Sequence, residues 1–181
     1  METRSAKGFS LIEVMFSLGI LTVGVLGAAA VMAAGIQNLA SSPADVIVTQ
    51  KAAQAIEAVF AARDSHRLNW NQIRNAAGYS GNDGGVFLDD PQKLYLAGPD
   101  GLVNTGDDTD EIESVTLPGM DRTLGTSDDA VVELLQYTRQ ITIRDVPGES
   151  GNLRTVTVTL KYQSGTTERT YTLHTLISAY S

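Results

Sequence analysis

The stretch GFSLIEVMFSLGIL at residues 8–21 decides the fold, because it opens a long apolar run that contains a single acid. Between residues 9 and 36 the only charged side chain is Glu13. A helix of that length, at about 1.5 Å per residue, is longer than the roughly 30 Å hydrocarbon core of a bilayer. Arg4 and Lys7 precede the run and no basic residue follows it closely, which predicts a cytoplasmic N-terminus.

Three interpretations of this segment are open. A secretory signal peptide has a basic start and small residues for cleavage, found here near residues 28–34, but its apolar region is usually only about 7–15 residues long. A plain membrane anchor would carry Glu13 at a cost of roughly 2.5–3.5 kcal/mol deep in the bilayer, with nothing gained. The third interpretation explains the acid, and it depends on the residues around it.

The segment GFSLIEVM, residues 8–15, resembles the processing motif of type IV prepilins and of the related pseudopilins of type II secretion. In that family a prepilin peptidase cuts after the glycine, here Gly8, and methylates the new N-terminal residue, here Phe9. The continuation ILTVGVLGAA at residues 20–29 further resembles the PilV-like minor pilins and the minor pseudopilins. The resemblance implies a cleaved leader and a filament built through the apolar helix.

Glu13 fits this implied role on physical grounds. Cleavage exposes an α-amine at Phe9 near the membrane surface, and a carboxylate in apolar surroundings is stabilised by a cation. Glu13 of one subunit can pair with the Phe9 amine of its neighbour, so a subunit out of register leaves both charges unpaired. We therefore expect Glu13 to be an assembly residue. The implied partners are prepilin peptidase, other pilin or pseudopilin subunits, the membrane before assembly and the inner-membrane assembly machinery.

Beyond the apolar run, the sequence predicts an amphipathic continuation of the helix. The segment SPAD at residues 42–45 has a Ser cap, a Pro in the first turn and an acid, which together predict a kink or a short break there. Residues at helical spacing then continue to about Arg63. They predict an apolar stripe, with Thr49 as its exception, that packs on a sheet: Val46, Thr49, Ala53, Ile56 and Phe60.

The C-terminal part of the chain predicts antiparallel strands. Residues 136–146, 153–163 and 168–178 alternate in polarity, and short turns separate them. Val156, Val158 and Leu160 are expected on one face. The expected fold class is therefore α+β and pilin-like, with a long N-terminal hydrophobic spine helix packed on a small C-terminal antiparallel β-sheet.

Five segments are expected along the chain. A leader peptide (1–8) precedes the transmembrane, filament-core half of the spine helix (9–41) and its amphipathic half (42–63). A helix-to-sheet loop region (64–133) then leads to the antiparallel sheet (134–181).

Acidic residues are concentrated in the loop region. The chain has a net charge of −8 and no cysteine, which excludes disulfides and Cys-ligated zinc and argues against binding to nucleic acid. Residues 98–133 hold ten acids and one base, Arg122, whereas the rest of the chain is nearly balanced. The acidity is therefore a local property of this segment.

An internal repeat accounts for much of this acidity. GPDGLVNTGDD (98–108) and GMDRTLGTSDD (119–129) both fit G-x-D-x-x-[VL]-x-T-x-D-D. Oxygen ligands without His or Cys favour calcium, and some pilins and pseudopilins bind calcium in their loops. The alternative is a pair of solvated acidic turns, or Asx-type caps, without a metal. The candidate calcium ligands are Asp100, Asp107, Asp108, Asp121, Asp128 and Asp129, with Asp110, Glu111 and Glu113 in reserve.

An enzyme is not expected. His66 lies among polar residues and His174 lies in a predicted strand, and neither H-E-x-x-H nor G-x-S-x-G occurs. We expect a structural minor pilin of a type IV pilus, with a place at or near the tip or in priming assembly. A minor pseudopilin of type II secretion is the alternative, and a membrane-anchored, calcium-binding adhesive module is the second alternative. The expected location is the bacterial inner membrane, crossed once with a cytoplasmic leader, and then a periplasmic or extracellular filament.

Overall fold

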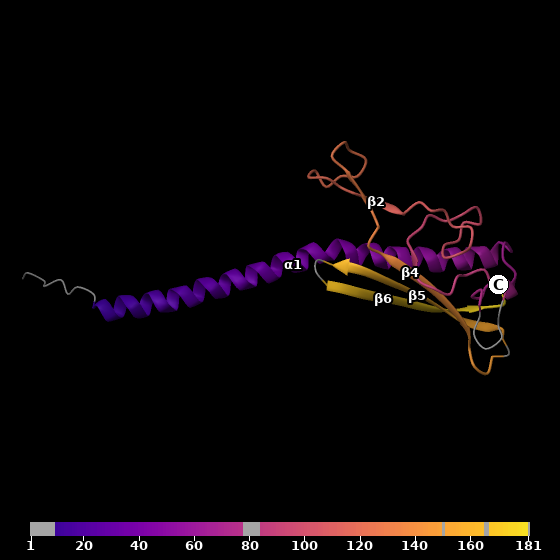
Figure 1. Cartoon of the computed structure of the whole chain (residues 1–181), viewed down its shortest axis with the longest axis horizontal. Helices are drawn as coiled ribbons and strands as arrows, with labels where there is room; N and C mark the ends of the chain where they lie inside the picture. Colours follow the sequence, from indigo (N-terminus) through magenta and orange to yellow (C-terminus); the bar gives the residue numbers. More distant parts are fainter. Residues whose placement is uncertain (1–9, 78–83, 150, 165–166, 181) are drawn as a thin grey trace, which may run out of the picture. The chain divides into compact units, whose positions relative to one another are not determined.

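The computed structural model describes residues 10–77, 84–149, 151–164 and 167–180, and Figure 1 labels the main elements. Two compact units divide between Ser42 and Pro43, and the long helix α1 contributes to both. The helices are α1 (Leu11–Asp64) and the 3₁₀ helix η1 (Trp70–Gln72). The strands are β1 (Gln92–Lys93), β2 (Ser114–Leu117), β3 (Ala130–Glu133), β4 (Thr138–Asp145), β5 (Leu153–Ser164) and β6 (Thr167–Ser178).

The first unit is the apolar part of α1. Leu11–Ala33 has a mean hydropathy of 2.2 and none of it is buried, so the helix is long and apolar enough to cross a membrane. Large apolar side chains are exposed on all its faces. Such a helix is stable only in surroundings that are themselves apolar, which are lipid or neighbouring helices.

Of the two predicted alternatives at residues 42–45, a kink or a short break, the break is wrong, because α1 remains helical through Pro43. A proline inside a helix removes one backbone hydrogen bond and crowds the preceding turn, but the helical turns on both sides can keep the helix continuous. A Ser-Pro pair therefore does not by itself predict the start of a helix when helix-forming sequence lies on both sides of it.

The second unit contains the sheet, and the predicted antiparallel arrangement is confirmed. The strand order is β1-β4-β5-β6, and every pairing is antiparallel. β4 pairs with β5 from Thr138↔Lys161 to Asp145↔Arg154. β5 pairs with β6 from Leu153↔Ser178 to Ser164↔Thr167. The short β1 extends the sheet beyond the three strands that alternation predicts.

The C-terminal half of α1 lies along one face of this sheet (Figure 1). Val156, Val158 and Leu160 are fully buried on that face, as predicted. The predicted helix stripe is only partly right: Val46 is 53% exposed, whereas Ile56 and Phe60 are partly buried and pack against the core. The residues that enter the core occupy a neighbouring stripe, where small side chains let helix and sheet approach closely. They are Val48, Ala52, Ala55, Val59 and Ala62.

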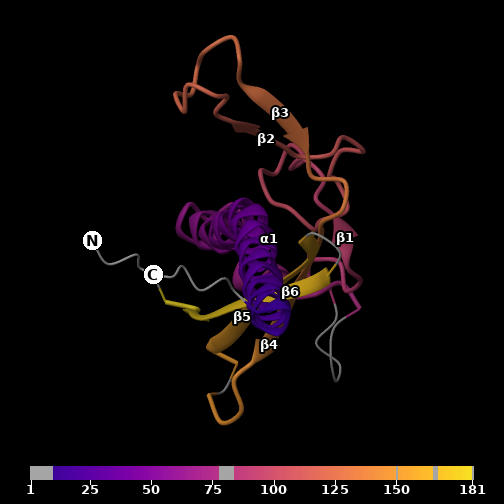
Figure 2. The ribbon, with the colours of Figure 1, turned by 90° about the vertical axis from the view of Figure 1, so that its left-hand side faces the viewer.

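A second, two-stranded sheet lies outside the predicted architecture. β2 and β3 pair from Ser114↔Glu133 to Leu117↔Ala130 and form a hairpin that carries the second acidic repeat. Figures 1 and 2 both show this hairpin on the side of α1 opposite to the four-stranded sheet. All four residues of β3 are exposed.

Candidate functional site

Glu13 lies in the first turn of α1, in a part of the helix that is otherwise apolar. Its backbone N–H donates to the carbonyl of Ser10 (3.0 Å), and the Ser17 hydroxyl donates to the Glu13 carbonyl (2.7 Å). The side chain is exposed, and it forms no ion pair with any residue that the structure describes. The predicted processing residues Gly8 and Phe9 lie outside the described residues.

The two acidic repeats adopt the same hydrogen-bonded turn. The N–H of Asp100 donates to Asp107 Oδ2 (3.2 Å), and the N–H of Asp121 donates to Asp128 Oδ2 (3.3 Å). Each first aspartate also accepts, through Oδ1, a hydrogen bond from the N–H two residues later, at 2.7 Å and 2.8 Å. The sequence repeat is therefore also a structural repeat.

The threonine of each repeat donates its hydroxyl to the Asp-Asp pair that follows it. The Thr105 hydroxyl donates to Asp107 Oδ1 (2.8 Å), and the Thr126 hydroxyl donates to Asp128 Oδ1 (2.7 Å). These bonds are the main reason that the pKa values of Asp107 and Asp128 lie below their ordinary value. Both carboxylates are therefore stabilised in their charged form without a metal.

The last aspartate of each repeat binds the backbone of its own loop. Asp108 Oδ2 accepts from the N–H of Asn104 (2.7 Å), and Asp129 Oδ2 accepts from the N–H of Gly125 (2.6 Å). Asn104 and Gly125 both have positive φ, at 63° and 91°. Burial raises the pKa of Asp108, although hydrogen bonds to its carboxylate oppose this.

The glycine that opens each repeat is explained by close approach. A Cβ on Gly98 would lie 2.1 Å from the carbonyl oxygen of Asp107, and one on Gly119 would lie 2.2 Å from Asp128 Oδ2. Neither contact is possible for a real side chain. The Gly, Asp, Thr and Asp-Asp positions of the repeat are thus all accounted for by the geometry of the turn.

The structure does not bring the predicted calcium ligands together into a metal site. Among the described residues, no group of three or more His, Cys, Asp or Glu side chains is placed to hold a metal ion. Asp107, Asp108 and Asp128 each use both carboxylate oxygens in hydrogen bonds within their own turn. The other three aspartates each accept backbone N–H groups through one oxygen. Calcium binding therefore stays a prediction, and hydrogen bonding gives the aspartates a role that needs no metal.

The two repeats differ in burial. Asn104 of the first repeat is fully buried, where its Nδ2 donates to the carbonyl of Arg139 (3.0 Å) and its Oδ1 accepts from Arg139 Nε (3.0 Å). In the second repeat all residues except the partly buried Gly119 and Asp129 are exposed. The first repeat is therefore docked on β4, whereas the second has the same turn with nothing packed on it.

Glu113, a reserve calcium ligand, instead joins three elements. Its Oε1 accepts from Arg139 Nη1 of β4 (2.8 Å), and its Oε2 lies 2.7 Å from Lys51 Nζ of α1. Both Glu113 and Arg139 are nearly buried. These ion pairs link the acidic loop region to α1 and to β4.

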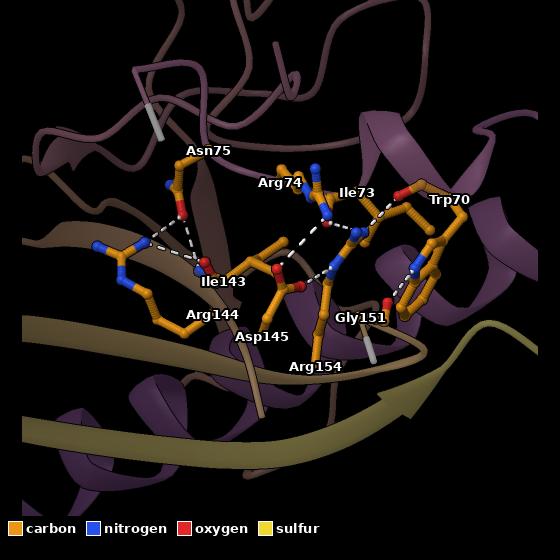
Figure 3. Close-up of polar contacts among 9 residues, drawn as sticks. All are labelled: Trp70, Ile73, Arg74, Asn75, Ile143, Arg144, Asp145, Gly151 and Arg154. Atoms are coloured by element: carbon orange, nitrogen blue, oxygen red, sulfur yellow. Dashed lines mark hydrogen bonds and ion pairs between the residues drawn. The ribbon is translucent and has the colours of Figure 1, made fainter. Parts of the chain in front are cut away.

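A second arginine fastens the loop after α1, as Figure 3 shows. Arg154 of β5 is fully buried, and its guanidinium lies 4.0 Å from the centre of the Trp70 ring. It donates to the carbonyls of Trp70 and Ile73 and, through Nε, to Asp145 Oδ1 (2.7 Å). Burial is the main cause that lowers the pKa of Arg154.

Comparison with known proteins identifies the N-terminal segment. Residues 3–29 match the family model described as prokaryotic N-terminal methylation motif. The N-terminal segment therefore carries the prepilin-type methylation motif of type IV pilins and pseudopilins. No curated protein and no solved structure matches the chain.

The motif gives the N-terminal segment a function. Prepilin peptidase processes chains that carry it, and such chains are structural subunits that assemble with other pilins. A long apolar helix that follows this motif is typical of an inner-membrane prepilin. His66, in the loop after α1, and His174, on β6, are both exposed.

The buried arginines of this pilin-like chain were missed from the sequence, although a signal existed. Arg139 precedes Ile141 and Ile143 in strict alternation, and Arg154 precedes Val156 in the same way. Alternation therefore places both arginines on the inner face of the sheet. An inward-facing charge predicts a buried partner, but the partners Glu113 and Trp70 lie in loops that carry no periodic pattern.

Proposed function

We propose that this pilin-like chain is a minor pilin of the PilV type that builds into a type IV pilus. Prepilin peptidase cuts it between Gly8 and Phe9 and methylates the new amine. The match of residues 3–29 to the methylation motif carries this proposal. The apolar helix that follows has the length and exposure of a segment that leaves the membrane for a filament core.

Glu13 is the assembly residue in this proposal. It lies in an apolar helix face, and it has no cation partner among the described residues. The α-amine of Phe9 on a neighbouring subunit supplies that cation only after cleavage. An ion pair formed in apolar surroundings is sensitive to register, because a misplaced subunit leaves two uncompensated charges. Cleavage and subunit alignment are therefore linked through one carboxylate.

Fractionation tests the pilus assignment against the secretion alternative. The full chain is expressed in cells that assemble type IV pili and secrete through a type II system, and surface filaments are sheared off. The proposal expects the mature chain in the sheared pilus fraction, and its loss when the pilus assembly ATPase is removed. Retention in the cell envelope that depends only on the secretion system would identify a minor pseudopilin instead.

Within a pilus, we place the subunit at or near the tip or in the priming of assembly. The test is the length and number of pili when the gene is deleted. A priming subunit predicts fewer pili of normal length, whereas unchanged pilus number contradicts priming.

A further inference from the structure

Strand β6 is the outermost strand of the four-stranded sheet, and its outer edge is open (Figure 1). It pairs with β5 over its whole length, from Leu153↔Ser178 to Ser164↔Thr167. Apart from the carbonyl of Ser178, which accepts from Arg63 Nη1 (3.0 Å), its backbone forms no hydrogen bond with any described residue outside β5. Such an edge presents a row of unpaired N–H and C=O groups to which another strand can hydrogen-bond.

The opposite edge of the sheet is closed by the chain itself. β1 pairs with the start of β4, and further along β4 the side chain of Asn75 takes the place of a neighbouring strand. Its Nδ2 donates to the carbonyl of Ile141 (2.8 Å), and its Oδ1 accepts from the N–H of Ile143 (2.7 Å). Asn75 is itself buried. The two edges of the sheet therefore differ, because only the β4 edge is covered.

Most of β6 lacks the features that protect edge strands in natural proteins. These features are prolines, bulges, lysines and inward-pointing charges. From Thr170 to Ser178 the sequence has no proline, no glycine and no Asp, Glu, Lys or Arg, and most of its residues are of types that favour strands. The pairing with β5 is continuous, so the strand has no bulge. This part of β6 is therefore suited to accept a further strand.

The inward-facing side chains of β6 are covered only in part. Tyr171 and Leu173 pair with Leu160 and Val158 of β5. The two β5 residues are fully buried, whereas Tyr171 and Leu173 are only partly buried, although both pack against the core. A strand added beside β6 would cover them, and the burial of apolar surface would stabilise the contact.

We propose that β6 pairs with an edge strand of a different pilin-type subunit, so that the sheet gains one strand in the assembly. Strand addition takes its affinity from main-chain hydrogen bonds and its specificity from the neighbouring side chains. Glu168, near the start of β6, forms no ion pair with a described residue, so a basic side chain opposite to it is complementary. The inference rests on the proposed function, because that function supplies the neighbouring subunit.

A second copy of this chain does not fit this edge. α1 runs in the same direction as β6, because Asp45 lies 3.1 Å from Arg169 near the start of the strand. Near the end of the strand, Arg63 donates to Ser178 (3.0 Å). Two β6 strands paired antiparallel about a twofold axis would therefore set their α1 helices in opposite directions, although the apolar segments that begin both helices belong in one membrane. Pairing of β6 with the β4 edge of another copy is blocked by β1 and Asn75.

One open edge and one closed edge suit a subunit of low copy number. Contacts that use two different edges repeat from subunit to subunit and build long assemblies. Because the β4 edge is closed, pairing at β6 stops after one partner. This is the behaviour expected of a minor subunit at or near the tip.

Photo-crosslinking in cells that assemble type IV pili tests the contact. A benzophenone amino acid replaces His174, which is exposed on β6, and filaments that contain the full chain are sheared off and irradiated. The matched control carries the same group at Thr142 of β4, because Thr142, Thr157 and His174 form one row across the sheet. We expect an adduct from the probe on β6, cross-linked to a peptide from an edge strand of another pilin-type subunit. The probe on β4 should give no adduct with that subunit.

An inward-pointing lysine shows whether strand addition is the cause. Thr175 faces inward, opposite the buried Val156, so the ammonium group of Thr175→Lys would be buried by an added strand. Thr172→Lys is the matched control, because residue 172 is exposed on the outer face of the same strand. The adduct yield from the probe at position 174 should fall roughly tenfold with Thr175→Lys and less than about twofold with Thr172→Lys. Denaturant unfolding of both variants checks that the sheet is intact.

Several results would overturn the inference. They are the absence of an adduct at position 174, an equal yield at position 142, an adduct between two copies of this chain, and an adduct only with a protein that is not a pilin. Equal yields from the two lysine variants would also overturn it. N-terminal processing and recovery in sheared filaments are measured in the same samples. A processed and incorporated chain without an adduct leaves the proposed function standing, whereas an unprocessed chain would overturn both.

Discussion

Glu113 and Arg139 form an ion pair of 2.8 Å with only 9% and 2% of their side chains exposed. Glu113 comes from the acidic loop region and Arg139 from the first long strand of the sheet. Lys51 of α1 binds the other oxygen of the same carboxylate. The docked acidic repeat, the helix and the sheet therefore meet at one buried carboxylate.

Loss of this carboxylate should destabilise the protein strongly. Glu113→Ala leaves Arg139 buried without its partner, and such a loss costs about 3–5 kcal/mol. Denaturant unfolding measures the change in the free energy of unfolding. Arg169→Ala is the matched control, because its ion pair with Asp45 is 41% and 44% exposed and should contribute about 0–1 kcal/mol. Equal effects of the two substitutions would contradict the role given to Glu113.

The two threonines of the repeats provide a matched pair of variants. Thr105→Val removes one hydroxyl that donates to both Asp107 and Asp108 in a buried turn, and should cost about 1–3 kcal/mol. Thr126→Val makes the same change in the exposed turn of the β2–β3 hairpin, and should leave the stability of the unit almost unchanged. Unfolding curves of the two variants compare them directly. A global loss of stability in Thr126→Val would mean that the β2–β3 hairpin contributes to the core.

Acid should weaken the first repeat. The pKa of Asp107 is lowered in the folded chain from 3.8, so its contribution to stability is present above that value and is lost as the pH falls through the folded pKa. Asp107→Asn removes the titrating group. Its melting temperature should therefore fall less than that of the unchanged protein between pH 6 and pH 3, in a thermal scan. A parallel fall in both proteins would argue against this contribution.

Calcium binding by the six aspartates is tested by calorimetric titration of the full chain in detergent. The prediction expects heat on addition of Ca²⁺ and a rise in melting temperature that a chelator reverses. Asp108→Asn is expected to abolish the response of the first repeat. With neither heat nor a thermal shift, the aspartates are left with the turn hydrogen bonds as their only role.

The strands of the sheet were predictable because alternation is a local property. Residues from Leu153 to Gln163 alternate, and their inner face is buried with Val156, Val158 and Leu160 as expected. The long helix was predictable for the same reason, because apolar residues fill its first half whatever packs on it. The stripe of α1 that packs on the sheet could not be predicted in full. Two neighbouring stripes of the helix are apolar, and the one with small side chains packs most closely on the sheet.

The structure of the loop region could be predicted from the sequence only in part. The repeat showed that residues 98–108 and 119–129 form one kind of unit, and the structure shows that hydrogen bonds within each turn explain its pattern. Nothing in the sequence showed that one copy is buried and the other projects. That difference depends on Asn104, which reaches Arg139, where the second copy has Gly125.

Assembly should depend on Glu13 whereas cleavage should not. Glu13→Val removes the carboxylate that we pair with the Phe9 amine, so the mature chain should form but should be depleted in sheared filaments. Ser17→Val is the matched control, since it changes a polar residue one turn further along the same helix. Immunoblots of sheared and cell-bound fractions give both readings. Normal incorporation of Glu13→Val would rule out the assembly role.

The central claim is that this chain is a processed filament subunit, and mass spectrometry of its mature N-terminus tests it most directly. The chain is purified from cells that contain prepilin peptidase, and its N-terminal peptide is sequenced. The account predicts a peptide that begins with N-methylated Phe9 and lacks residues 1–8. An intact Met1 terminus, or cleavage near residues 28–34 as in a secretory signal, would contradict it.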